Sequence, residues 1–121
     1  MPRVNLLVMR AREPEKLAGF YSALGLRFTP HRHGHGPLHF AAVDDDGGVF
    51  EIYPLRRSEG AGPTQELRIG FAVDDVQLTV NNLVANGAQL ATPPTVSPWG
   101  LRAVITDPEG HHVEITQPTD Q

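Results

Sequence analysis

The sequence contains no cysteine. That absence excludes disulfides, thiolate zinc sites and cysteine nucleophiles, and it suits the reducing cytoplasm, where we expect the protein. No apolar run approaches the roughly 20 residues that a membrane helix needs, so we expect no membrane partner. Ten Lys and Arg residues against fourteen Asp and Glu give a formal net charge of −4. Such a chain lacks a cationic field for a polyanion, so we expect no nucleic-acid partner.

Glycine and proline are abundant, with 12 and 11 residues in a chain of 121. This content predicts many turns and short elements. About 40% of the residues are hydrophobic and 20% are charged, which is enough apolar surface for a packed core. The length is that of one ordinary domain.

The hydrophobic pattern predicts the same series of elements twice. In the first half we expect strands at residues 4–9, 26–29, 38–43 and 49–53, with a helix at 14–24. In the second half we expect strands at 67–73, 89–91, 101–106 and 113–116, with a helix from Asp75 to Gly87. Residues 92–100 contain three prolines, and we expect a loop there.

An internal repeat supports this doubling. At an offset of 62, Gly25 falls on Gly87, and at an offset of 63 Glu51 falls on Glu114. We therefore expect an α+β domain over residues 1–121, built from two βαβββ modules at 1–55 and 65–121 with a linker at 56–64. The modules would be related by a pseudo-twofold axis, with an eight-stranded mixed sheet curled around a concave cavity.

Three segments carry a resemblance to a known family: F-Y-S-A-L-G-L at 20–26, G-V-F-E-I-Y-P at 48–54 and D-P-E-G-H-H-V-E-I at 107–115. In these segments the chain resembles the vicinal oxygen chelate superfamily, which includes glyoxalase I, bleomycin-resistance proteins and extradiol dioxygenases. The fold hosts lyases, oxygenases, transferases and non-catalytic binding proteins, so the resemblance leaves open whether the chain is an enzyme. It implies a homodimer.

The resemblance also implies where a metal would bind. In metal-dependent members one ligand comes from each of the first, fourth, fifth and eighth strands, and these positions are Leu6, Glu51, Arg68 and Glu114 here. Leucine cannot coordinate a metal, and arginine stays protonated. We therefore expect no metal cofactor. The alternative is a divalent metal held by Glu51, Glu114 and His39, in a lyase or dioxygenase.

We expect the cavity to bind a small organic molecule. Arg68, flanked by Glu51 and Glu114, would form its polar floor; a purely structural ion network is the competing interpretation. The remaining candidates are aromatic or polar residues placed near the cavity by strand parity or by the S-P-W-G loop at 97–100: Tyr53, Trp99, His39 and Arg102. His31, His33 and His35 alternate with glycine and arginine, and we expect a solvated loop there.

Overall fold

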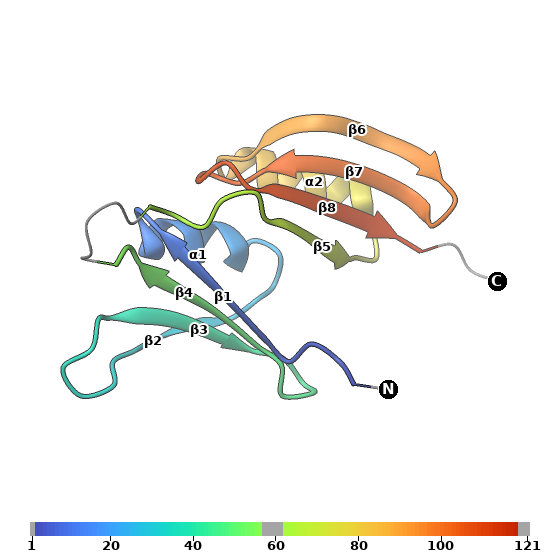
Figure 1. Cartoon of the computed structure of the whole chain (residues 1–121). Helices are drawn as coiled ribbons and strands as arrows, with labels where there is room; N and C mark the ends of the chain where they lie inside the picture. The colour runs from blue at the N-terminus through green and yellow to red at the C-terminus, as the bar shows by residue number, and fades with distance from the viewer. Residues whose placement is uncertain (1, 57–61, 119–121) are drawn as a thin grey trace. The chain divides into compact units, whose positions relative to one another are not determined.

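A computed structural model describes residues 2–56 and 62–118 and divides the chain into two compact units, Met1–Thr64 and Gln65–Gln121. We call them the first and second modules (Figure 1). Residues 57–61 of the expected linker lie outside the described residues. Thr64, at the end of that linker, pairs with the first strand, because its backbone N donates to the Arg10 carbonyl at 2.9 Å.

The first module is a four-stranded mixed sheet with one helix. Its elements are β1 (Leu6–Ala11), α1 (Pro14–Ser22), β2 (Phe28–His31), β3 (His39–Val43) and β4 (Val49–Pro54). The strand order is β1-β4-β3-β2, in which β1 and β4 are parallel and the other pairs are antiparallel.

The second module repeats this topology. Its elements are β5 (Arg68–Ala72), α2 (Val76–Ala85), β6 (Gln89–Ser97), β7 (Gly100–Thr106) and β8 (His112–Gln117), in the strand order β5-β8-β7-β6. The predicted fold class, α+β with two βαβββ modules and eight strands in mixed sheets, is confirmed. The concave cavity stays a prediction.

Each helix covers one face of its own sheet. In the first module Tyr21 of α1 packs edge-on against Phe50 of β4, with ring centroids 5.2 Å apart. In the second, α2 is capped by Asp75, whose carboxylate accepts a hydrogen bond from the Leu78 backbone N at 3.0 Å, and the helix buries Leu83. Because side chains alternate along a strand, the other face of each sheet is left to the residues of opposite parity.

The burial of β8 shows this alternation directly. Val113 and Ile115 are fully buried, whereas Glu114 between them is only partly covered. The same parity places Glu51 of β4 away from α1, because the adjacent Ile52 is fully buried. The two glutamates of the sequence repeat therefore lie on the helix-free faces of their sheets.

Our prediction of a loop at residues 92–100 is wrong. The chain stays extended through Ser97 as part of β6, and only Pro98 and Trp99 form a tight turn into β7. The sheet tolerates the prolines because β6 is an edge strand, where a missing N–H costs no ladder hydrogen bond. The pairing of β6 with β7 shifts register twice, between Leu90 and Thr92 and between Thr92 and Thr95.

The β7–β8 turn is built around a buried carboxylate. One oxygen of Asp107 accepts from the backbone N of Glu109 and of His111, at 2.9 and 3.0 Å. The other oxygen bonds the Nδ1 of His111 at 2.8 Å. These contacts explain the D-P-E-G-H segment as a turn that fixes where β8 begins.

Two glycines give opposite predictions for stability. A Cβ on Gly100 would lie 2.2 Å from the Gln117 carbonyl oxygen, and its φ of 119° already disfavours other residues. We expect Gly100→Ala to lower the free energy of unfolding by more than about 1 kcal/mol. Gly19, inside α1, has nothing within 4 Å of such a Cβ. At this position we expect Gly19→Ala to raise the free energy of unfolding by about 0.5–1 kcal/mol. Urea unfolding of both variants measures this, and a stable Gly100→Ala variant would contradict the tight turn.

Candidate functional site

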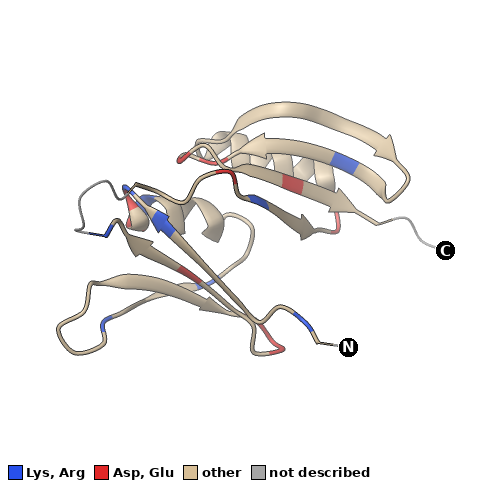
Figure 2. Ribbon diagram, viewed as in Figure 1, with Lys and Arg blue, Asp and Glu red and all other residues tan. Residues whose placement is uncertain are grey.

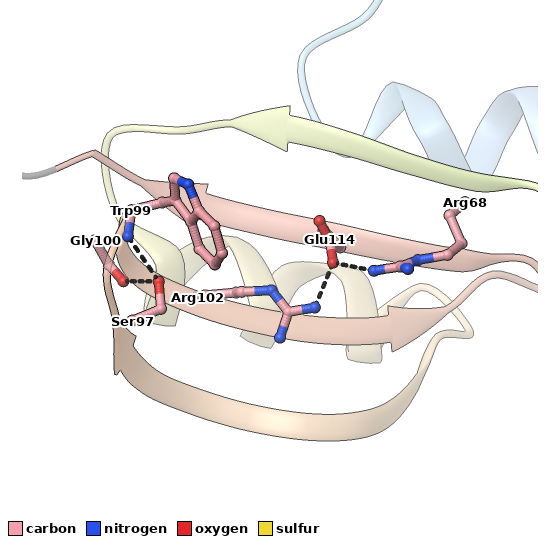
Figure 3. A network of polar contacts seen from close by, with 6 residues as sticks. All are labelled: Arg68, Ser97, Trp99, Gly100, Arg102 and Glu114. Atoms are coloured by element: carbon pink, nitrogen blue, oxygen red, sulfur yellow. Dashed lines mark hydrogen bonds and ion pairs between the residues drawn. The ribbon is translucent and has the colours of Figure 1, made fainter.

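A carboxylate held by two arginines is the main polar feature of the second module (Figure 3). Arg68 of β5 donates from Nη2 to Glu114 Oε1 at 2.6 Å. Arg102 of β7 donates to the same oxygen. The three residues come from three adjacent strands, so the sheet itself sets their spacing.

These residues line a pocket of about 580 Å³ in the second module. Its other lining residues come from the β6–β7 hairpin and from β8: Ser97, Trp99 and Thr116. The Ser97 hydroxyl accepts from the Trp99 backbone N at 3.2 Å and donates to the Gly100 carbonyl at 2.7 Å. The hairpin turn therefore holds the Trp99 side chain beside the pocket rather than in the core, and the residue is 72% exposed.

The pocket carries a net positive charge. Hydrogen bonds from Arg102 and then from Arg68 hold the pKa of Glu114 below its ordinary value, so this carboxyl is ionised at neutral pH. Two guanidinium groups against one carboxylate leave an excess of one positive charge. Each guanidinium has five N–H donors and directs a single Nη2 to Glu114. The remaining donors suit a further anion.

On the corresponding face of the first module, aromatic and histidine rings stack on one another. The His39 ring lies on Tyr53 with centroids 4.1 Å apart and an interplanar angle of 6°. The Arg10 guanidinium lies 4.7 Å from the centre of the same Tyr53 ring. His33 and His31 approach His39 from the β2–β3 side, with ring centroids 5.2 and 6.0 Å away.

His39 is buried and has one nitrogen without a hydrogen-bond partner. Its Nδ1 lies 3.2 Å from the Pro37 carbonyl, so this nitrogen carries a proton. Its Nε2 lies 3.4 Å from Glu51 Oε2 but makes no hydrogen bond. Because His39 is 1% exposed, a ligand on this face would meet Glu51 first.

The comparisons with known proteins fix the family. A model of the glyoxalase/bleomycin resistance protein/dioxygenase superfamily matches residues 3–115. The chain belongs to this superfamily. No curated protein matches the sequence. No helix in the described part of the chain is both long and apolar enough to cross a membrane.

Solved structures share the superfamily fold. A hypothetical protein, SA1046 from S. aureus, is 20% identical, with a TM-score of 0.75 over 97% of this chain and 95% of that one. TnmS3, an antibiotic binding protein from Streptomyces sp. CB03234, is 21% identical, with a TM-score of 0.73 over 98% of both chains. A superfamily enzyme from Burkholderia phytofirmans PsJN is 18% identical, with a TM-score of 0.73 over 98% of this chain and all of that one.

The metal positions implied by the superfamily do not fit a metal here. Arg68 holds a positive charge against Glu114, and Arg102 adds a second. Leu6 offers no donor atom. A divalent cation would have to displace both guanidinium groups from the one carboxylate they share. Across residues 2–56 and 62–118, no three His, Asp or Glu side chains lie close enough to hold a metal ion together.

The structure distributes the predicted site residues over both modules. Arg68, Arg102, Glu114 and Trp99 line one pocket, whereas in the first module His39 contacts both Glu51 and Tyr53. We expected Glu51 and Glu114 to flank Arg68; within its own module Arg68 pairs with Glu114. We did not predict the hydrogen bond from Arg102 to Glu114 or the position of Thr116 in the pocket lining. The β7–β8 register, which sets Arg102 opposite Thr116, was the signal that could have found both.

The lowered pKa of Glu114 predicts a pH-dependent stability. The carboxylate adds stability above its ordinary pKa near 4.5, and this is lost as the pH falls through the lower pKa of the folded state. At pH 7 we expect Glu114→Gln to lower the free energy of unfolding by about 1 kcal/mol or less, since the pairs are partly exposed. Towards about pH 2 the difference should vanish. Urea unfolding across this range measures it, with Asp45→Asn as the control; a pH-independent difference would contradict the assignment.

Proposed function

We propose that this protein binds a small organic molecule with an aromatic body and an anionic group, in the pocket of the second module and without a metal. The observation that carries the proposal is the pairing of two arginines with Trp99 around one pocket of about 580 Å³. An anionic group would balance the excess positive charge beside Glu114. An aromatic ring would gain contact with the exposed indole.

The size and composition of the pocket support a ligand rather than a structural role. Drug-sized ligands occupy pockets of roughly 300–1,000 Å³ with apolar walls and a few polar groups. An ion network that only fastened strands together would not need a largely exposed tryptophan held beside it by a serine hydroxyl. The similarity to TnmS3, an antibiotic binding protein, is consistent with binding rather than turnover. The homodimer and the cytoplasmic location expected from the sequence belong to the same proposal.

Trp99 provides an internal test, because it is the only tryptophan of the chain. We expect aromatic carboxylates to change its emission on binding, and their uncharged methyl esters to bind at least about tenfold more weakly. Arg102→Ala and Arg68→Ala should each weaken the carboxylates by a similar factor. Arg27→Ala, an exposed arginine outside the pocket, is the matched control. Equal affinities for acid and ester, or for Arg102→Ala and the wild type, would refute the assigned role.

A metal-dependent lyase or dioxygenase is the second candidate, favoured by the approach of His39 to Glu51 at 3.4 Å. Elemental analysis of the untagged protein separates the two proposals. We expect no stoichiometric metal, because two guanidinium groups occupy Glu114. One metal per chain, lost in Glu114→Ala but kept without His31, His33 and His35, would establish the second candidate instead.

A further inference from the structure

A cavity larger than the second-module pocket lies in the first module, away from every candidate site residue named above. It measures about 1240 Å³. It lies where the first turn of α1, the loop between β2 and β3, and the residues after β4 meet. We call it the α1 groove.

The α1 groove is lined by apolar and polar side chains in similar measure. Phe40 of β3 and Leu38 and Leu55 beside it supply apolar side chains. Three prolines also line it, and proline has no N–H: Pro14, Pro37 and Pro54. The part of a ligand that contacts the leucines and Phe40 would therefore be apolar, and its polar contacts would come from the charged side chains of the same groove.

The rim of the α1 groove carries a net positive charge, although the whole chain is net negative. Four Lys and Arg side chains line the groove against two glutamates, whereas the whole chain carries a net charge of −4. Figure 2 shows charged positions gathered around the start of α1 and the end of β1. Local charge of the opposite sign to the whole chain focuses anions on this groove.

Two of the four cations are already engaged. The Lys16 ammonium lies 3.8 Å from the Glu13 carboxylate. Arg10 donates to the Pro54 carbonyl at 3.3 Å and lies over the Tyr53 ring.

The other two cations are Arg32, from the β2–β3 loop, and Arg56, after β4. No hydrogen bond or ion pair joins either of them to another of the described residues. Glu15 also lines the groove, and no ion pair joins its carboxylate to a cation among the described residues. Two guanidinium groups against one carboxylate leave a positive excess.

We propose that the α1 groove is a second ligand site, which binds an organic carboxylate with an apolar body. Arg32 and Arg56 hold the carboxylate, and Phe40, Leu38 and Leu55 contact the apolar body. A guanidinium suits this task because its planar N–H groups match the two oxygens of a carboxylate. The site is independent of the second-module pocket, since its lining residues all belong to the first module.

Octanoate is the probe, and amide chemical-shift mapping on the whole chain is the measurement. We expect octanoate to shift the amide resonances of Leu38, Phe40 and Leu55. Octylamine has the same tail and the opposite charge, and we expect it to give no saturable shift. The double variant Arg32→Ala/Arg56→Ala should weaken octanoate about tenfold or more. The double lysine variant, which keeps both charges, should recover part of the affinity. Arg27→Ala and Arg102→Ala should bind octanoate at the groove as the wild type does.

Three results would overturn this proposal. The first is saturable binding of octylamine as tight as that of octanoate. The second is octanoate affinity unchanged in the Arg32→Ala/Arg56→Ala variant. The third is a set of shifts confined to Ser97, Trp99 and Thr116, which would place the anion in the second-module pocket and leave the proposed function of that pocket intact.

Discussion

One-sided coverage of each sheet is the constraint on which the rest of the structure depends. A single helix buries one face, where Ile52 or Val113 and Ile115 are fully enclosed. Strict alternation then sends every second residue to the uncovered face. Glu51 and Glu114 lie there because they sit next to core residues in the central strands. A one-residue slip of β8 would bury Glu114 under α2 and expose the core, so the same register that stabilises the module also positions its carboxylate.

The two modules share this framework but surround their carboxylates differently. The register sets Val8 opposite Glu51 and Gly70 opposite Glu114. A Cβ on Gly70 would meet nothing closer than 3.8 Å, so packing does not require the glycine, and its absence of a side chain leaves the sheet open beside Glu114. In the first module rings stack over the equivalent surface. Side-chain rings therefore contact one another on the helix-free face of the first module, whereas a pocket lies beside the carboxylate of the second.

Alternation and the repeat made the modules, the core faces and both glutamates predictable from the sequence. These features depend on local periodicity, which one sequence displays. The extent of β6 was not predictable in the same way, because prolines stop a central strand but not an edge strand, and only the sheet order shows which strand is the edge. The α1 groove left no periodic signal either. It arises where Arg32 and Arg56, 24 positions apart in the sequence, line one space beside the first turn of α1.

Under the proposed function, two guanidinium groups stand where metal-dependent members would hold a cation, and this changes what the superfamily scaffold can do in this chain. A bound cation concentrates two charges at one point and leaves open positions that polarise a substrate. Arg68 and Arg102 spread their charge over planar groups that cannot accept electron pairs, and they already share one carboxylate. The proposed function needs only their attraction for an anion. Reversible binding of an anionic molecule would fit this arrangement, since the guanidinium groups could share their donors between Glu114 and a ligand without any covalent bond being broken.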